Sequence, residues 1–540
     1  MTPNKEKFNT VFKGKAGKKV FASLLCACFL FLQNPAFSIE PSSKAFNLIT
    51  VVDTFLNLDD NLKNDYENAD EKTRQKQEFI DTTRRFNQGN VSLAYTDYSK
   101  IISELDNDIA LFVFAKSMYE IGFFTLGDVA ISKIKNQTYF ALQIENLKKS
   151  YKDSYDLEKG EEIYLAKAYS SIYFDNTPEE TAFDLSKKTG LMEKSDYANF
   201  IMAQALLESR QYQQALMYID IAIRKNPENS NYLSYKVEVL NRSGKHKDAL
   251  KLIEKYETTN VLTPEFKNKI LIQKEETIAS LSNNENDKRF HLISANYLRG
   301  NYYKVINECQ NILNFNKNNY KILTLQAQSQ LNTGKVDLAK KNLLQSFDLN
   351  KNYAPTLAGL GDISYIEGDK QKAAEYYKKA LKTDKANILN MIKLQIVYKE
   401  LPGNEKNLAK LEKQINAQSN PKNLFYEYYM VSAGVLKNNL KLKREYLMKS
   451  LAINLLYESA QGEYLAYLSG AKKQRPMENF LFMISFVNNF NYTYYYYTGL
   501  MELALGNREN ARANMKHCIS LNPDYEPANS AILNMEESTI

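Results

Sequence analysis

Apolar residues between Asp287 and Asn387 recur at helical spacing and are interrupted by single glycines. After Gly368, the residues Ala373, Tyr377 and Ala380 follow at steps of four and three. This spacing places them on one face of a helix, with polar residues on the other faces. The pattern predicts a short amphipathic helix that packs by one side and faces solvent with the other.

The same pattern returns at a fixed interval along the chain. Gly300, Gly334 and Gly368 are each 34 residues apart, and a glycine at a turn ends one helix before the next begins. A period of this length is typical of stacked helix-turn-helix units. We therefore predict an all-α fold, a superhelical solenoid of antiparallel helix pairs. Each unit of a solenoid contacts only its neighbours, so 540 residues need no single core.

The residues around these glycines resemble the tetratricopeptide repeat family, which has small residues at its eighth, twentieth and twenty-seventh positions and a turn residue at the fifteenth. The unit 354–387 matches with Gly361, Gly368, Ala373 and Ala380. Two further units match at several positions: 196–229 with Ala203, Ala215, Ala222 and Pro227, and 492–525 with Gly499, Gly506, Ala511 and Pro523, where Cys518 replaces the expected alanine. A turn glycine with alanine five residues later occurs at Gly89/Ala94, Gly244/Ala249, Gly334/Ala339, Gly368/Ala373 and Gly506/Ala511.

The quality of the repeats divides the chain into five predicted segments. These are a signal peptide (1–38), an N-terminal helical or spacer segment (39–85), degenerate helical repeats (86–195), the main repeat array (196–400) and C-terminal helical repeats ending in a well-formed one (401–540). Proline at a helix start predicts helices beginning at Pro178 and Pro264. Pro402 and Gly403 predict the end of a helix that runs from Ile388 to Lys399.

The first 38 residues have the composition of an export signal. Six lysines precede an apolar run from Val20 to Leu32, and small residues follow at Ala36 and Ser38. We expect an exported bacterial protein that is periplasmic or extracellular and associated with the envelope. Two alternatives remain: a retained signal anchor, or a lipoprotein modified at Cys26 or Cys28.

Removal of this leader changes the charge and the cysteine content. The formal net charge of the whole chain is +7, and the leader accounts for +5 of it, which leaves +2. Nucleic-acid binding draws on clustered excess Lys and Arg, so it is not expected. Of the four cysteines, Cys309 and Cys518 remain, at apolar positions of distant second helices. Two buried thiols are favoured over a disulfide.

Residues for catalysis or cofactor binding do not group along the sequence. His246, His291 and His517 lie on different repeats, and no histidine pair has metal-ligand spacing. The glycines stand singly at turns instead of forming a phosphate-binding loop. We expect no cofactor, no metal and no enzymatic activity.

The family resemblance implies a binding groove lined by the first helix of each repeat. The positions that tend to touch ligand in the family correspond here to Phe200, Gln204, Phe290, Ser294, Tyr297, Thr324, Gln328, Asn332, Asp362 and Tyr365. Amides can hydrogen-bond a peptide backbone and aromatic rings can bury its side chains. Alternatively, Phe200 and Phe290 fill gaps between helices. Relatives that clamp a C-terminal carboxylate use Lys and Asn at positions that hold other residues here, which argues against that mode.

Dense tyrosine runs in the last quarter of the chain predict a second contact surface. Tyr426, Tyr428 and Tyr429 form one run and residues 494–497 another. Consecutive residues of a helix point to all sides, so some of these rings should be exposed, and exposed tyrosine is favoured at interfaces. We predict a C-terminal contact patch at Tyr496 and Tyr497.

These observations predict a non-catalytic scaffold or adaptor of the bacterial cell envelope that binds a protein or peptide along its groove. It would bind no nucleic acid and would have no membrane span after signal cleavage. One alternative is a structural subunit of an envelope assembly or secretion complex. Another is an accessory protein to an envelope enzyme or glycan-handling system.

Overall fold

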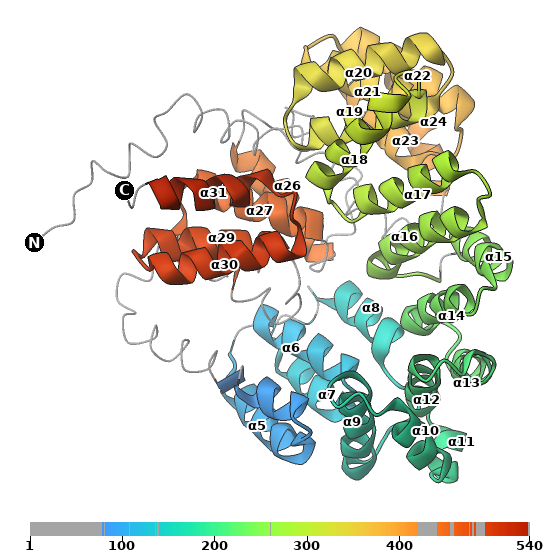
Figure 1. Ribbon diagram of the computed structural model, residues 1–540, viewed down its shortest axis with the longest axis vertical. Coiled ribbons are helices and arrows are strands. Elements are labelled where there is room, and N and C mark those ends of the chain that lie inside the picture. Colours follow the sequence, from blue (N-terminus) through green and yellow to red (C-terminus); the bar gives the residue numbers. More distant parts are fainter. Residues whose placement is uncertain are drawn as a thin grey trace, which may run out of the picture. The chain divides into compact units, whose positions relative to one another are not determined.

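The fold is entirely helical over the part of the chain that the structure describes (Figure 1). The computed structural model describes residues 78–79, 81–106, 108–135, 137, 140–259, 261–417, 440–453, 458–474, 476–477, 480–481 and 492–537. No strand occurs within these ranges, which confirms the predicted all-α class. The predicted signal peptide and most of the predicted 39–85 segment lie outside the described residues. No helix in the described ranges is long and apolar enough to cross a membrane.

The chain divides into two compact units. The N-terminal unit contains the described residues up to Asn283 together with residues 480–481, and the C-terminal unit contains the described residues of 284–477 and 492–537. The division falls inside the predicted main array, at the polar stretch between two helices.

The N-terminal unit is a series of helices joined by short turns. Its helices are α5 (Val91–Glu104), α6 (Asp108–Glu120), α7 (Phe124–Lys133), α8 (Ala141–Tyr151), α9 (Lys159–Tyr173), α10 (Pro178–Ser186), α11 (Thr189–Lys194), α12 (Asp196–Glu208), α13 (Tyr212–Lys225), α14 (Ser230–Arg242), α15 (His246–Glu257) and α16 (Pro264–Leu281). The pairs α9/α10, α12/α13 and α14/α15 pack as antiparallel neighbours. The predicted starts at Pro178 and Pro264 are confirmed.

The C-terminal unit repeats the same arrangement. Its helices are α17 (Glu285–Leu298), α18 (Tyr302–Phe315), α19 (Tyr320–Asn332), α20 (Val336–Leu349), α21 (Ala354–Ile366), α22 (Lys370–Thr383), α23 (Ile388–Glu400), α24 (Glu405–Ala417), α26 (Leu440–Ile453), α27 (Glu458–Gly470), α29 (Tyr492–Ala504), α30 (Arg508–Leu521) and α31 (Glu526–Glu537). The predicted helix end before Pro402 is confirmed.

Glycine serves two purposes in the repeats. At the turns it adopts a left-handed backbone, as at Gly334 (φ 77°) and Gly368 (φ 87°), where other residues would be strained. Within α21, Gly361 lets the helix approach α22: a Cβ atom at Gly361 would lie 2.5 Å from Cε1 of Tyr377. The predicted close approach at Gly361 is therefore confirmed.

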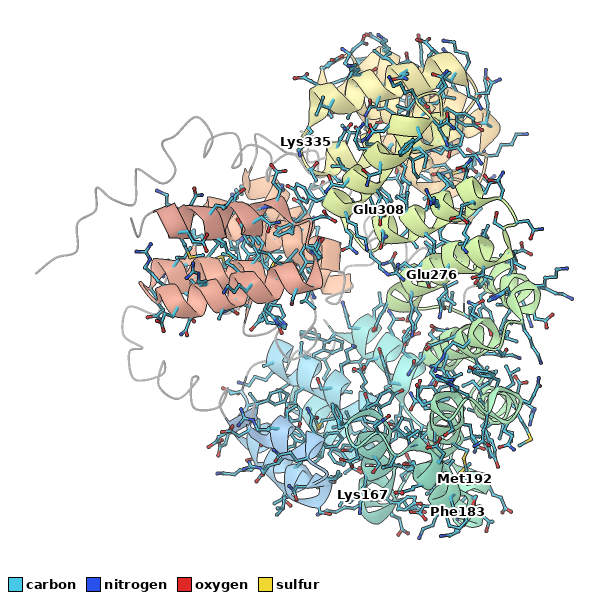
Figure 2. All side chains as sticks on the ribbon, viewed as in Figure 1. Lys167, Phe183, Met192, Glu276, Glu308 and Lys335 are labelled. Atoms are coloured by element: carbon cyan, nitrogen blue, oxygen red, sulfur yellow. The ribbon has the colours of Figure 1, made fainter. Side chains whose placement is uncertain are left out.

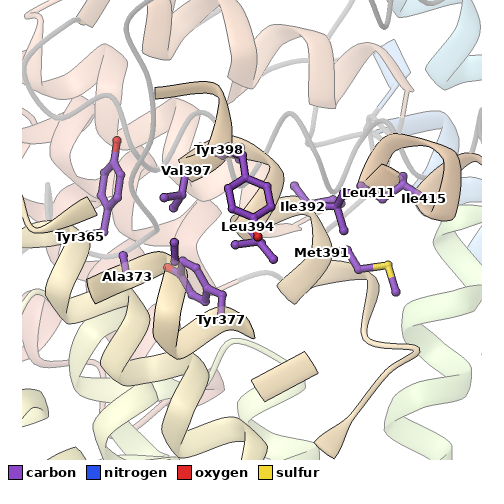
Figure 3. Packing of buried hydrophobic residues seen from close by; sticks show 12 residues of the cluster. Tyr365, Ala373, Tyr377, Met391, Ile392, Leu394, Val397, Tyr398, Leu411 and Ile415 are labelled. Atoms are coloured by element: carbon purple, nitrogen blue, oxygen red, sulfur yellow. The ribbon is translucent and has the colours of Figure 1, made fainter. Parts of the chain in front are cut away.

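The core of a repeat is continuous with that of the next. One cluster joins Tyr377 of α22 to Ile392 and Val397 of α23 and to Leu411 of α24, all buried (Figure 3). Burying such side chains stabilises the fold by roughly 1.5–3 kcal/mol each. Each helix pair thus depends on its neighbour to cover its apolar face. Cys309 and Cys518 are also buried, and both are free thiols, as predicted.

A buried ion pair crosses three helices of this core. Asp362 Oδ2 lies 2.8 Å from Lys393 Nζ, and Asp362 Oδ1 accepts a hydrogen bond of 2.7 Å from the Tyr377 hydroxyl. These contacts link α21, α22 and α23. Burial raises the pKa of Asp362, although Lys393 opposes this effect. Removing either partner would leave a buried charge without compensation.

The last repeat contacts α18 and the turns beside it. The Tyr492 hydroxyl donates to the Gly300 carbonyl (2.9 Å), and Asn307 Nδ2 donates to Asp524 (2.7 Å). Lys335, labelled in Figure 2, pairs with Glu526 at 3.0 Å. The residues 492–537 are therefore tied to the array by polar contacts.

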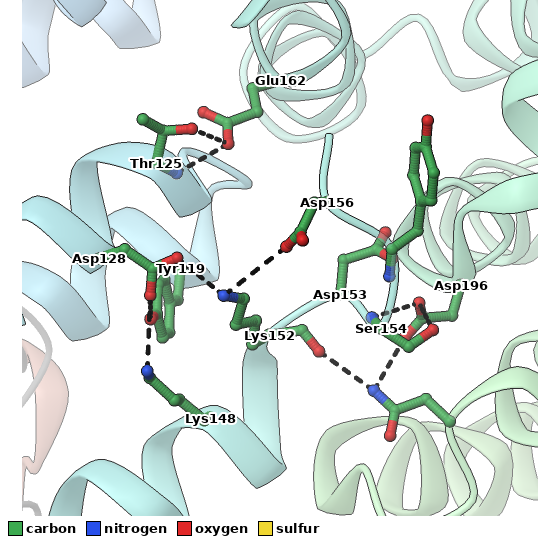
Figure 4. Close-up of polar contacts among 12 residues, drawn as sticks. Tyr119, Thr125, Asp128, Lys148, Lys152, Asp153, Ser154, Asp156, Glu162 and Asp196 are labelled. Carbon is green, nitrogen blue, oxygen red and sulfur yellow. Dashed lines mark hydrogen bonds and ion pairs between the residues drawn. The ribbon is translucent and has the colours of Figure 1, made fainter. Parts of the chain in front are cut away.

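A pair of buried aspartates organises the loop between α8 and α9 in the N-terminal unit (Figure 4). Asp153 accepts hydrogen bonds from the backbone N–H of Tyr155 (2.7 Å) and Tyr197 (3.0 Å) and from the Ser195 hydroxyl. Asp196 accepts from the N–H and hydroxyl of Ser154, both at 2.7 Å. These hydrogen bonds fix the loop between α8 and α9 to the start of α12.

The two aspartates share a proton unequally. Burial, followed by the neighbouring Asp196, raises the pKa of Asp153 to about 8. Burial also opposes ionisation of Asp196, but hydrogen bonds from Asp153, Ser154 and Asn226 outweigh it and lower the pKa of Asp196. Near neutral pH the pair therefore carries one negative charge on Asp196.

Substitution of Gly361 by alanine should destabilise the C-terminal unit. The new Cβ would overlap the Tyr377 ring, and overpacking of this kind costs about 1–3 kcal/mol. The matched control is Gly160→Ala in α9, where a Cβ meets nothing within 4 Å. Urea unfolding followed by circular dichroism would measure both. Equal unfolding midpoints for the two variants would contradict the predicted close packing.

The proton held by Asp153 should make stability depend on pH. An aspartate in the unfolded chain titrates near 3.8, so the unfolded chain loses this proton at lower pH than the folded protein does. Stability therefore falls as pH rises from the unfolded pKa to about 8 and then levels off. Asp153→Asn should flatten this fall, whereas Asp156→Asn, at a side chain that is 97% exposed, should not. Melting temperatures between about pH 6 and pH 9 would measure it, and parallel curves for the wild type and Asp153→Asn would refute the assignment.

Candidate functional site

Polar and aromatic side chains gather on the first helices of three successive pairs, α9, α12 and α14. We refer to them as the tyrosine–carboxylate cluster, which consists of Tyr173, Phe200, Gln204, Glu208, Tyr235, Glu238 and Arg242. All belong to the N-terminal unit. Neighbouring first helices of a solenoid lie side by side, so their side chains form a single surface.

Helical spacing brings the members of the cluster onto facing surfaces. On α12, Phe200, Gln204 and Glu208 follow at steps of four and share one face. On α14, Tyr235 and Arg242 lie two turns apart, again on one face. The register between the helices is then fixed by the contacts at both ends of these faces.

A ring contact and an ion pair mark the two ends. The Phe200 and Tyr235 rings lie 5.1 Å apart, centroid to centroid, in an edge-to-face arrangement. Two turns further along α12, Glu208 binds Arg242 through two contacts of 2.5 and 3.2 Å. Gln204 lies between these ends.

Two polar atoms of the cluster are buried without a hydrogen-bond partner. They are Oε1 of Gln204 and the hydroxyl of Tyr235, and each side chain is only 6% exposed. Nearly all buried polar groups in native proteins are paired, and an unpaired one costs roughly 1–3 kcal/mol. Both atoms have almost no solvent-accessible surface, so they lie beneath the exposed charges of the cluster and not among them.

The charged members of the cluster remain accessible to solvent. The side chains of Glu208, Glu238 and Arg242 are 36–37% exposed, and Tyr173 is 44% exposed. Glu238 is 4.0 Å from Arg242, whose closer partner is Glu208. The single guanidinium is therefore shared by two carboxylates.

The pKa shifts of Tyr173 and Tyr235 indicate the sign of the electrostatic potential around the cluster. Burial of the hydroxyl, followed by the carboxylates of Glu238 and Glu208, raises the pKa of Tyr173, and Arg242 only partly opposes this. Burial, followed by Tyr173 and Glu238, likewise raises the pKa of Tyr235 well above its usual value. Negative charge thus prevails around both hydroxyls.

The structure separates the ten predicted groove residues into two groups. Six are buried, and only Phe290, Ser294, Tyr297 and Gln328 are half-buried: the buried ones are Phe200, Gln204, Thr324, Asn332, Asp362 and Tyr365. Phe200 and Gln204 belong to the tyrosine–carboxylate cluster. Phe200 packs on Tyr232 and Tyr235, as the alternative interpretation anticipated.

Three of the buried residues use their polar groups inside the fold. The Thr324 hydroxyl lies 2.6 Å from that of Thr356. The Asp362 carboxylate is bound to Lys393 (2.8 Å), and the Tyr365 hydroxyl donates to Glu400 (2.5 Å). These contacts join neighbouring repeats of the C-terminal unit.

The contact patch predicted at Tyr496 and Tyr497 requires exposed side chains, and this exposure is wrong. The two side chains are only 5% and 3% exposed. Both side chains are covered because α29 packs on both α27 and α30. The Tyr496 ring also lies 5.3 Å from that of Tyr525. Tyr426, Tyr428 and Tyr429 lie outside the described residues.

Sequence reasoning missed five members of the cluster, although the repeat itself carried a signal for three of them. Gln204 and Glu238 are 34 residues apart, and so are Glu208 and Arg242. They therefore occupy two equivalent positions in successive repeats. Polar and charged residues at both positions indicate a shared surface, whereas apolar residues there would indicate packing.

No set of three or more His, Cys, Asp or Glu side chains in the described ranges is arranged to hold a metal ion. The groups of the cluster are an amide, phenols, carboxylates and a guanidinium. These groups form hydrogen bonds and ion pairs, and their arrangement suits recognition of another molecule.

Comparison with known proteins identifies the repeats. Tetratricopeptide repeat models match residues 202–260 and 324–388, and a second model of the same description matches residues 492–525. The first match contains five members of the cluster, from Gln204 to Arg242. No curated protein matches the sequence significantly.

Several solved helical-repeat structures are similar to parts of this chain. The Cut9–Hcn1 hetero-tetramer of the APC/C has a chain that is 12% identical with a TM-score of 0.29, covering 84% of this chain and 95% of that one. Yeast Tom70 is 13% identical with a TM-score of 0.27, covering 71% and 96%. A tetratricopeptide repeat protein from Parabacteroides merdae is 12% identical with a TM-score of 0.26, covering 63% and 98%.

These TM-scores are too low to transfer a partner or an activity, so the assignment rests on the sequence matches and on the helix pairs themselves. The matched segments of this chain are tetratricopeptide repeats within an all-α solenoid.

Proposed function

We propose that this protein is a non-catalytic scaffold that binds a segment of another protein along the first helices of its N-terminal unit. The observation that carries the proposal is the group of partly exposed charged side chains, Glu208, Glu238 and Arg242, beside the exposed ring of Tyr173. A bound polypeptide brings N–H and C=O groups at regular intervals, and these can pair with the accessible carboxylates and guanidinium.

The remaining members of the cluster support a polypeptide as the bound molecule. Tyr173 exposes nearly half of its surface, and tyrosine offers a large contact area with little loss of conformational freedom. The half-exposed Glu208, Glu238 and Arg242 form a polar rim. Tyrosine and arginine beside a polar rim are usual in protein–protein interfaces.

We also propose that the scaffold acts in the bacterial cell envelope. The support comes from the first 38 residues, where six lysines precede an apolar run and small residues. Fractionation of cells that produce the full chain would test it. Recovery of the whole, unprocessed chain from the cytoplasm would contradict this location.

Site-specific crosslinking tests the scaffold directly. A photo-crosslinking amino acid at Glu238 should capture a polypeptide in the native host, because this side chain is half exposed and lies in the cluster. The matched control is Met217 on α13, which is 50% exposed but belongs to a second helix. The captured band should be at least severalfold stronger from position 238. A band of equal strength at both positions, or none at position 238, would refute binding at the cluster.

A further inference from the structure

We propose that the tyrosine–carboxylate cluster recognises a basic side chain, arginine or lysine, on the protein segment that it binds. This inference rests on the proposed scaffold function and specifies the chemistry of its partner. It follows from three features of the cluster: its charge, its accessible hydrogen-bond acceptors, and its exposed aromatic surface.

Negative charge exceeds positive charge around the cluster. Glu208 and Glu238 are accompanied by one cation, Arg242. A third carboxylate, Glu120 of α6, also acts on the Tyr173 hydroxyl. Glu120 lies 3.6 Å from Lys116, but Lys116 is shared with Glu265 at 3.5 Å. Each cation therefore serves two carboxylates, and a further cation would be attracted.

The accessible hydrogen-bonding groups of the cluster favour the same kind of partner. The carboxylates of Glu208 and Glu238 are acceptors that cannot donate, and both side chains are partly exposed. Guanidinium and ammonium groups carry donors and no acceptors, which complements this set. An acidic side chain or a chain-terminal carboxylate would bring the wrong charge and the wrong hydrogen-bonding group.

An exposed ring completes the site. Tyr173 is 44% exposed, and its hydroxyl is acted on by Glu208, Glu238 and Arg242. A cation over the face of a tyrosine ring gains about 0.5–1 kcal/mol at an accessible position. A basic side chain entering between the rings of α9 and the carboxylates of α12 and α14 would use both attractions.

The test compares two labelled peptides that differ only in charge. Fluorescein-labelled Gly-Ser-Arg-Tyr-Arg-Ser-Gly and Gly-Ser-Glu-Tyr-Glu-Ser-Gly are titrated with the full chain, and binding is followed by fluorescence anisotropy. The arginine peptide should bind at least tenfold more tightly. The variant Glu238→Gln, which removes one charge and keeps the shape, should weaken its binding about threefold to tenfold.

The control variant is Glu254→Gln, an exposed glutamate of the same unit that lies on the second helix α15. Its binding should equal that of the wild type. Equal weakening by Glu238→Gln and Glu254→Gln, or equal binding of the two peptides, would overturn the inference. If crosslinking at position 238 still captures a polypeptide in that case, the scaffold function stands and only the preference for a basic side chain is lost. If nothing is captured there, the scaffold function itself fails.

Discussion

The close approach of the two helices within each repeat is the constraint on which the structure depends. Where α21 crosses α22, the backbone of Gly361 meets the ring of Tyr377, and where α29 crosses α30, Gly499 meets Met515. A large side chain that lies opposite a glycine lets the two helices pack tightly. This tight packing sets the angle at which the next helix pair is added. Because each pair covers its neighbour, a displaced helix at one crossing would also displace the helix pairs that follow it in the unit.

This constraint explains which features were predictable from the sequence. Turn glycines and small residues at helix crossings must occur at fixed places, so Gly361, Gly368 and the helix starts at Pro178 and Pro264 were identified correctly. The exposure of individual side chains was harder, because it depends on which helix covers a given face. Tyr496 and Tyr497 are buried because α29 is covered on two sides, and nothing in their own stretch of sequence records this.

Polar residues on first helices have two different roles in the two units. In the C-terminal unit, Asp362 and Thr324 form bonds inside the fold and link repeats. In the N-terminal unit, Gln204 and Tyr235 are equally buried, yet each retains an atom without a partner. The sequence alone does not distinguish a buried polar group that is paired from one that is not, because the difference lies in whether a complementary group, such as Lys393, lies opposite.

The central claim is that partners are bound by the first helices α9, α12 and α14. Amide hydrogen exchange of the full chain, with and without a captured partner, tests this most directly. The account predicts added protection concentrated in α12 and α14, around residues 204–208 and 235–242, with little change in α13 and α15. Added protection confined to α13 and α15 would contradict it.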